Sequence, residues 1–353
     1  MRLKTFCALA VAVCLGSASA QTNLTGAGAT FPNPIYQKWF SEYHNENKDV
    51  AINYQSIGSG AGINQVQKGT VDFGASDGPM TDEQIADTKF KVFHIPTVLG
   101  AVALTYNIPG VNTELKFTPD LIADIFLGNI KKWNDPRLAK ANPGVKFPDA
   151  DVIVVHRTDG SGTTYIFTDY LTKVSPDWAK GPKKGTSVSW PVGLGGKGSE
   201  GVSGLVKQTE GSIGYVELIY ALSNNMLVGS VQNSSGVFVK PSLDSTTAAA
   251  ASVKSMPEDF RVSITNPPGK DAYPICSFTW LLVPAEWKDA TKEKAFVNFL
   301  NWMVDKGQTM TTDLKYAPLP KNVAAKVKAR IREIKVATNQ AEKTKDNSKQ
   351  AKK

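Results

Sequence analysis

The sequence predicts an α/β protein, and two features carry this prediction. A buried strand, a glycine-rich turn and a helix follow one another several times along the chain, an order typical of α/β domains that bind ligands at their strand ends. The chain has 353 residues, which is enough for two domains with separate cores. No repeat of the solenoid kind is visible.

Residues 1–20 have the pattern of a signal peptide. A basic start with Arg2 and Lys4 precedes the apolar run 6–15, and small residues lead up to Ala20. The apolar run is too short for a permanent membrane anchor. We therefore expect cleavage after Ala20 and export of the mature protein.

Two of the three cysteines, Cys7 and Cys14, lie in this leader, so no disulfide is possible within the mature chain. Cys276 lies in an apolar, strand-like run, and we expect a buried, inert thiol there. The formal charge of +8 includes +2 from the leader and +8 from the segment that starts at Lys321, so residues 21–320 carry −2. Such a body does not have the basic surface of a nucleic-acid-binding protein.

Three strand–turn–helix junctions open the mature chain. The strand and turn of 24–32 lead to a helix with aromatic residues at core spacing, and the strand 50–54 leads into the glycine turn 57–62. Residues 71–78 form the third junction, a strand that ends in Ser-Asp-Gly. Residues 81–84 form a capping box for the next helix.

The middle of the chain contains a crossing segment and the most informative motif. Residues 92–106 are apolar and are broken by a proline and a glycine, which predicts two strands that meet at a bend between domains. A helix is expected over 118–127. The buried strand 152–155 precedes the polar turn 157–164, and a helix follows over 165–171.

Residues 181–201 are rich in glycine, lysine and serine, and a surface loop is the expectation for them. A P-loop is excluded because Pro191 and Gly198 stand where that motif needs glycine and serine or threonine. Residues 211–216 form a turn that enters a strand.

The C-terminal part returns to the first domain. Residues 275–283 form an apolar strand, and 292–304 form an amphipathic helix. A basic amphipathic helix is expected over 321–334, and the final segment 336–353 is polar enough for disorder.

The turn 157–164 has the composition of an oxyanion site. Backbone N–H groups of a first helical turn lack partners inside the helix, and Arg157 adds a permanent charge with a forked donor set. Hydroxyl donors come from Ser161, Thr163 and Thr164. The alternative is an ordinary helix start with Asp159 or Ser161 as its cap.

Metal and hydrolase chemistry find little support in the sequence. His44, His94 and His156 are scattered without ligand spacing, although His156 could line a cleft beside Arg157. Neither Ser59 nor Ser161 has the flanking glycines of a nucleophile elbow. An exported phosphatase, or a scaffold whose basic tail binds acidic polymers, remain as alternatives.

Asp77 is the one carboxylate that does not fit a generic anion site. Near pH 7 phosphate carries a proton and sulfate does not, so an ionised carboxylate gains a hydrogen bond only with phosphate. Mismatches of this kind discriminate by roughly 10⁴–10⁵. The alternative is that Asp77 is a turn residue of the common Asp-Gly type.

Four segments, 25–32, 71–77, 157–163 and 211–217, resemble the periplasmic phosphate-binding protein of the high-affinity phosphate ABC transporter. The similarity extends from about Leu24 to about Pro320. This resemblance implies a two-lobed periplasmic-binding-protein fold, in which each lobe is a mixed sheet flanked by helices. It also implies a receptor that clamps dehydrated inorganic phosphate between the lobes and passes it to a membrane permease without turnover.

The resemblance also implies the ligands, position by position. Those of the first lobe are Thr30, Phe31 through its amide, Ser59 and Asp77, and those of the second are Arg157, Ser161, Gly162 through its amide, and Thr163. Asp159 matches the carboxylate that pairs with the arginine. Gly60 is a departure, because many members of the family have serine there.

The implied domain division gives the first lobe residues 21–100 and 276–335, and the second lobe residues 101–275. Residues 336–353 are expected to form a disordered basic tail, and the resemblance does not explain the basic segment that follows Pro320. We further expect a periplasmic monomer that has the permease as its partner, without nucleic acid, cofactor or metal.

Overall fold

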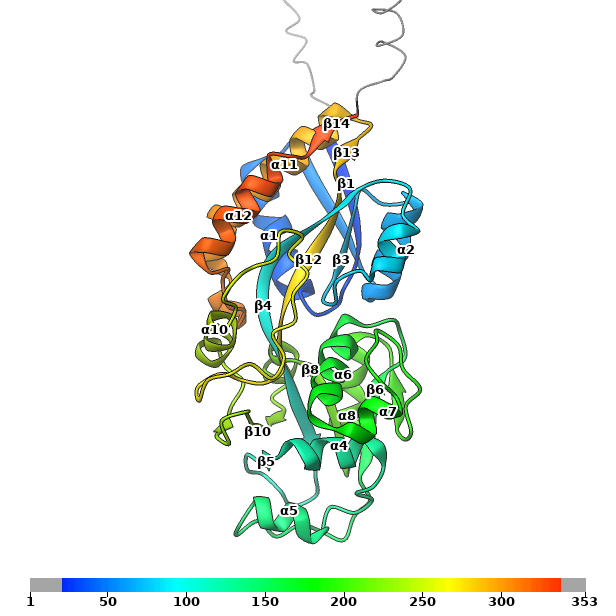
Figure 1. The fold of residues 1–353 in the computed structure, drawn as a ribbon, viewed down its shortest axis with the longest axis vertical. Coiled ribbons are helices and arrows are strands. Elements are labelled where there is room, and N and C mark those ends of the chain that lie inside the picture. The colour runs from blue at the N-terminus through cyan, green and yellow to red at the C-terminus, as the bar shows by residue number, and fades with distance from the viewer. Residues whose placement is uncertain (1–20, 338–353) are drawn as a thin grey trace, which may run out of the picture.

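The structure is a computed structural model that describes residues 21–337. Two bodies lie one above the other along the long axis (Figure 1). Within the described residues, the main sheet has nine strands in the order β2-β1-β3-β12-β4-β8-β6-β7, with β9 also paired to β4. We call the body with β1–β3 and β12 lobe 1, and the body with β6–β8 lobe 2. The two-lobed α/β fold expected from the sequence is confirmed.

Lobe 1 is built on three parallel strands, with β12 antiparallel beside them. Its strands are β1 (Thr22–Gly28), β2 (Val50–Ser56), β3 (Phe73–Ser76), β12 (Cys276–Pro284), β13 (Glu286–Trp287) and β14 (Lys335–Val336). Its helices are α1 (Asn33–Glu46), α2 (Ser59–Lys68), α3 (Asp82–Ala86), α11 (Ala290–Asp305), α12 (Lys321–Ile331) and the 3₁₀ turns η1 (Gly307–Met310) and η2 (Thr312–Leu314).

Lobe 2 has β6 at its centre, in parallel between β8 and β7. Its strands are β6 (Ile153–Arg157), β7 (Leu194–Gly196), β8 (Ser212–Glu217), β9 (Leu227–Val228) and the small sheet of β5 (Lys116–Phe117), β10 (Ser230–Gln232) and β11 (Phe238–Val239). Its helices are α4 (Pro119–Leu127), α5 (Pro136–Ala141), α6 (Gly162–Val174), α7 (Pro176–Lys180), α8 (Gly198–Gln208) and α9 (Leu218–Ser223), and α10 (Leu243–Ala251) packs on β4 and β12.

The segment predicted as two strands is one continuous strand, β4 (Val92–Asn107), which belongs to both lobes. Residues 92–101 pair with β12, and residues 102–107 pair with β8. The expected irregularity is a bulge: Trp280 lies opposite Pro96 and Thr279 opposite Val98, which leaves Thr97 as the extra residue. A proline has no N–H to give to the ladder, so the register shifts there while the strand continues.

The aromatic residues of α1 form part of the core, as their spacing predicts. Tyr36, Trp39, Phe40 and Tyr43 are all buried. Cys276 is a buried free thiol, and burial raises its pKa to about 12, so it is inert near neutrality.

Two sequence expectations need correction. Within the stretch 181–201, residues 194–196 are the edge strand β7 and α8 begins at Gly198, so a continuous surface loop was wrong there. Val336 belongs to β14, which pairs with β13, so disorder does not begin at 336. The rest of the predicted tail and the predicted signal peptide lie outside the described residues.

Over residues 21–337, no helix combines the length and the apolar character that a membrane crossing requires.

Candidate functional site

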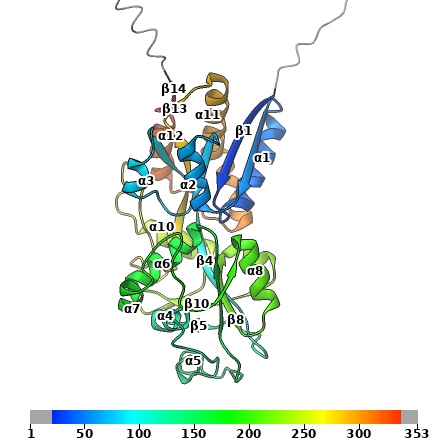
Figure 2. The same ribbon diagram turned by 90° about the vertical axis from the view of Figure 1, so that its right-hand side faces the viewer.

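The site lies where the two lobes face each other. Parallel strands of one sheet end at the same edge, so the turns after β1, β2 and β3 gather on one side of lobe 1. The turns after β6 and β7 gather likewise on lobe 2. Figure 2 shows α6 and α8 at the end of lobe 2 that faces lobe 1. Four helix N-termini, those of α1, α2, α6 and α8, therefore point into one region, which favours an anion.

The predicted residues of lobe 1 are all buried at this edge. Thr30 and Phe31 follow β1, Ser59 is the first residue of α2, and Asp77 follows β3. The Asp77 amide donates to Ser59 Oγ at 3.2 Å, which joins two of these turns. Gly58 is the N-cap of α2 and has φ +95°, a conformation that glycine adopts without a steric penalty.

On lobe 2, Ser161 is the N-cap of α6. Its Oγ accepts from the Thr164 amide at 3.1 Å, which decides between the two predicted caps in favour of Ser161 and against Asp159. Gly162 and Thr163 are the first residues of the helix and are also buried. Arg157 ends β6, and its amide donates to the Tyr215 hydroxyl at 3.2 Å.

Arg157 and Asp159 form the expected pair in a bidentate geometry. Arg157 Nε donates to Asp159 Oδ1 at 2.8 Å, and Nη2 donates to Oδ2 at 2.5 Å. Burial acts to raise the pKa of Asp159, but the hydrogen bonds and charge of Arg157 outweigh it and hold that pKa below its ordinary value. The third nitrogen, Nη1, is directed toward Thr163 Oγ1 at 3.4 Å. The pair thus presents one guanidinium edge to the helix start.

The two halves are in direct contact across the lobes. The Gly162 amide donates to Ser59 Oγ at 3.0 Å, and the Gly60 amide donates to the Gly160 carbonyl at 2.8 Å. A Cβ on Gly162 would lie 2.5 Å from both Asp77 Oδ2 and Ser59 Oγ, so this helix start faces the carboxyl closely. Gly60 stands where many members of the family have serine. A Cβ at this position would lie 3.1 Å from Gly160 Cα, so a side chain there would crowd the contact between the lobes.

The sequence reasoning missed two side chains that hold the site together. Ser199 Oγ lies 2.9 Å from Thr30 Oγ1 in the facing lobe, and the Ser199 amide also points to that oxygen at 3.3 Å. Its local signal, a helix start after the glycines, was present but was assigned to a surface loop. Thr279 Oγ1 donates to Asp77 Oδ1 at 2.8 Å. The two are 202 positions apart, and no local pattern links them.

Asp77 has the most informative electrostatics of the cluster. Burial raises its pKa to about 7, although Thr279, Arg157 and Ser59 each act to lower it. Asp159 adds a smaller upward contribution. The carboxyl therefore changes its protonation state near neutrality, where it can accept a hydrogen bond when ionised.

His156 does not join this cluster. Its ring stacks on Trp190 with the centroids 4.8 Å apart, and its Nδ1 lies 3.0 Å from the Arg157 carbonyl. It is a packed histidine, one of the two interpretations that the sequence left open. Across residues 21–337, no group of three or more histidines, cysteines or carboxylates could hold a metal ion.

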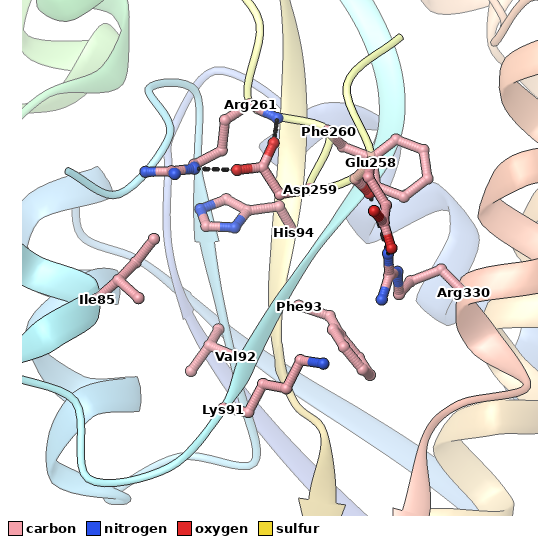
Figure 3. A pocket seen from close by; sticks show the side chains of 10 residues that line it. All are labelled: Ile85, Lys91, Val92, Phe93, His94, Glu258, Asp259, Phe260, Arg261 and Arg330. Carbon is pink, nitrogen blue, oxygen red and sulfur yellow. Dashed lines mark hydrogen bonds and ion pairs between the residues drawn. The ribbon is translucent and has the colours of Figure 1, made fainter. Parts of the chain in front are cut away.

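A separate pocket of about 500 Å³ opens beside the first residues of β4 (Figure 3). His94 Nε2 accepts from the Met80 amide at 3.1 Å, and burial lowers the pKa of His94 to about 4, so the ring is neutral. Charges of both signs line the pocket, with Arg261 hydrogen-bonded to Asp259 and Arg330 over the Phe93 ring. None of the predicted site residues lines it.

Comparison with known families identifies the class of protein to which the chain belongs. Residues 16–306 match the model of the PBP superfamily domain, which defines the chain as a PBP-type protein. A solved periplasmic phosphate-binding protein with bound phosphate shares the fold at a TM-score of 0.71 and 21% identity, over 87% of this chain and 93% of its own. A phosphate-binding protein from Stenotrophomonas maltophilia does so at 0.68 and 20%, over 87% and 93%.

Curated relatives narrow the class to one family. A phosphate-binding protein PstS from Xylella fastidiosa is 44% identical over 308 residues, 87% of this chain and 84% of its own. The PstS from Pasteurella multocida is 44% identical over 88% and 90%, and that from Methanocaldococcus jannaschii is 37% identical over 90% of each chain. The chain belongs to this PstS family, as the sequence motifs predict.

Proposed function

We propose that this protein binds inorganic phosphate between its two lobes and delivers it to an ABC permease for import. One observation carries the proposal: hydroxyl and amide donors from both lobes, the charge of Arg157 and the carboxyl of Asp77 meet in one buried cluster. The relatives, which are phosphate-binding proteins, favour the same ligand.

Each residue has a role in this proposal. Arg157 supplies the charge for the anion, and Asp159 moderates it. Asp77, when ionised, accepts a hydrogen bond from the O–H group that phosphate carries and sulfate lacks. The donors to the remaining phosphate oxygens are the side chains of Thr30, Ser59, Ser161 and Thr163 and the amides of Phe31 and Gly162.

The energetics are sufficient without a basic surface. A micromolar Kd corresponds to about −8 kcal/mol. Hydrogen bonds to a charged group contribute about 1.5–3 kcal/mol each, so a handful covers that figure even after the cost of ordering two lobes.

The protein acts as a receptor without turnover of the ligand. Ser59 Oγ accepts hydrogen bonds from the Asp77 and Gly162 amides, and Ser161 Oγ accepts from the Thr164 amide. A nucleophilic serine needs a neighbouring base that takes its proton. Ser161 has none among these contacts, and the carboxyl beside Ser59 is Asp77, which we propose as the acceptor for the phosphate hydrogen.

The remaining parts of the proposal concern the whole chain. We infer cleavage of the leader after Ala20, a periplasmic location and a monomeric state. We also propose that lobe 1 comprises about 21–101 and 276–337. The segment in which the chain passes back from lobe 2 to lobe 1 precedes Cys276. Its residues contact both lobes: the Phe260 carbonyl accepts from Trp280 Nε1 of lobe 1, and Thr265 Oγ1 donates to Asp169 Oδ2 of lobe 2.

Calorimetric titration of the mature protein with phosphate and with sulfate, in separate runs, tests the proposal. We expect phosphate to bind at micromolar concentrations or below and sulfate to bind at least about 10³-fold more weakly, because a buried acceptor is left unpaired by sulfate. Equal binding of both anions, or of neither, would contradict the proposal. Hydrolysis of a phosphate monoester that is lost in an Arg157 variant would support an enzyme instead.

A further inference from the structure

We propose that Thr279 is a positioning residue that sets the proton selectivity of the site by holding one oxygen of Asp77. The inference rests on the proposed role of Asp77 in phosphate binding. It assigns a function to a residue outside the predicted ligand set.

The geometry divides the two carboxyl oxygens of Asp77. Thr279 Oγ1 donates to Oδ1 at 2.8 Å, whereas Oδ2 lies on the side of Gly162, at 2.5 Å from the position of a Cβ on that glycine. One oxygen is therefore held inside lobe 1, and the other faces the N-terminus of α6. A ligand in the cluster meets an acceptor that is fixed in direction.

The strand that carries Thr279 is shaped for this contact. Side chains two residues apart lie on the same face of a strand, and both Ser277 and Thr279 of β12 are directed to Asp77. Ser277 reaches only the backbone carbonyl of Asp77, at 3.4 Å. The β4 bulge lies directly opposite, and the extra residue Thr97 donates to the Thr279 carbonyl at 3.3 Å. Bulges re-aim side chains beside functional sites.

Chemistry explains why a hydroxyl is needed at this point. A donor to Oδ1 stabilises the carboxylate over the carboxylic acid, and loss of a charged hydrogen bond of about 1.5–3 kcal/mol shifts a pKa by about one to two units. The Thr279 donor keeps Asp77 ionised close to neutrality. The ionised form only accepts, so it takes a strong hydrogen bond from the P–OH group and repels the proton-free sulfate, whereas the neutral acid can donate its own O–H to either anion.

Other ionisable groups face Asp77 from several elements. Arg157 and Asp159 lie across the lobe contact and keep their opposite charges in an ion pair. Burial raises the pKa of Glu217 well above its ordinary value, which favours the neutral form of that carboxyl. Burial likewise raises the pKa of the three tyrosines near Asp77, which stay neutral over the pH range of interest: Tyr36, Tyr54 and Tyr316. Asp77, with a pKa raised to about 7, is the group whose titration near neutrality the test follows.

The test compares Thr279→Val, Thr279→Ala, Thr279→Ser and Ser277→Ala with the wild type and Asp77→Asn. Each protein is titrated calorimetrically with phosphate and with sulfate from about pH 5.5 to about pH 9, and the Asp77 carboxyl carbon is followed by NMR without ligand. Thr279→Ala provides a second variant without the hydroxyl in case the valine disturbs the sheet. Ser277→Ala removes a buried neighbouring hydroxyl that does not touch the carboxyl, and is the matched control.

We expect the Asp77 pKa to rise by about one unit or more in Thr279→Val. The ratio of phosphate to sulfate affinity then falls about tenfold or more at pH 7 and recovers as the pH rises and Asp77 ionises. Thr279→Ser and Ser277→Ala keep the wild-type profile. Asp77→Asn has a low ratio at every pH.

The outcomes separate this inference from the proposed function. A wild type that does not prefer phosphate would overturn the proposed function itself. A wild type that prefers phosphate, with Thr279→Val and Thr279→Ala superimposed on its pH profile, overturns the role of Thr279 alone. An Asp77→Asn variant with an unchanged ratio also overturns the inference, while phosphate binding stands. A fall in affinity for both anions that is equal at every pH shows a merely structural threonine.

Discussion

At the scale of single residues, the site depends on charges that are buried and partnered. Arg157 and Asp159 have side chains that are 2% and 11% exposed, and they lie in a bidentate pair. A buried charge is costly without its partner, so the two residues must be considered together. Asp77 differs, since its partners are hydroxyls and its charge changes near neutrality.

The first prediction concerns the Arg157–Asp159 pair. Arg157→Met leaves the Asp159 carboxylate buried and unpaired, so we expect the free energy of unfolding to fall by about 3–5 kcal/mol and phosphate binding to be lost. The double variant Arg157→Met/Asp159→Leu should recover most of the stability and none of the binding. Urea unfolding and calorimetry measure the two effects, and binding by the double variant would contradict the assigned role of Arg157.

The second prediction concerns pH. The pKa of Asp77 is raised from 3.8 to about 7 in the folded protein, so the folded state holds that proton more tightly than the unfolded state. The contribution of Asp77 to the free energy of unfolding is fully present below about pH 4 and is lost as the pH rises through about 7. In phosphate-free protein, Asp77→Asn should therefore become more stable than the wild type as the pH rises, by up to about 4 kcal/mol above pH 7.

Urea unfolding of both proteins at intervals between about pH 4 and pH 8 gives this difference directly, because other titrating groups cancel between them. A difference that is constant over this range would show that the Asp77 carboxyl keeps an ordinary pKa.

At the scale of elements, the start of α6 is the closest approach of lobe 2 to the carboxyl of lobe 1. Gly162 donates its amide across the lobes to Ser59 Oγ. A Cβ at this position would collide with Asp77 Oδ2 and Ser59 Oγ, which explains glycine there.

The third prediction follows from that contact. In Gly162→Ala the new Cβ would meet Asp77 Oδ2 and Ser59 Oγ at 2.5 Å, so we expect the lobes to close incompletely and phosphate affinity to fall about 100-fold or more. Alanine favours the helical conformation, so we expect the loss to come from the contact between the lobes and not from α6 itself. Gly204→Ala is the control, because no atom lies within 4 Å of its Cβ, and it should raise stability by about 0.5–1 kcal/mol with affinity unchanged. Equal affinity of both variants would contradict the close contact.

At the scale of the molecule, the two lobes share β4, and the C-terminal helix completes lobe 1. The side chains of Val323, Val327 and Ile331 on α12 are buried, and α12 packs on α11. The basic segment that starts at Lys321 is therefore partly a structural element.

The fourth prediction compares two truncations. Removal of residues 321–353 exposes the α11 surface and deletes three buried apolar side chains that are each worth about 1.5–3 kcal/mol, so we expect a loss of about 5 kcal/mol or more in the free energy of unfolding. Removal of 338–353 alone should leave stability unchanged. Phosphate affinity of the protein that remains folded should be the same for both, because α12 makes no contact with the predicted ligands. Equal melting temperatures of the two truncated proteins would contradict the packing of α12.

The sequence by itself determined the α/β class, the strand–turn–helix junctions and the PstS family. Those features are local: glycine turns, caps such as Thr81 with Gln84, and apolar runs act over a few neighbouring residues. The family resemblance of four local motifs implied the ligand set, which stays a proposal for binding.

Only the tertiary structure decided how the junctions meet. It showed β4 as one strand through both lobes, β7 and the start of α8 inside a supposed surface loop, and Ser199 beside Thr30. It also brought Thr279 to Asp77 from a distant part of the chain. The physical reason is that sheet pairing and lobe closure join residues by burial and hydrogen bonds that have no fixed spacing in sequence. The pKa of a buried carboxyl depends on such neighbours and cannot be read from the residues adjacent to it.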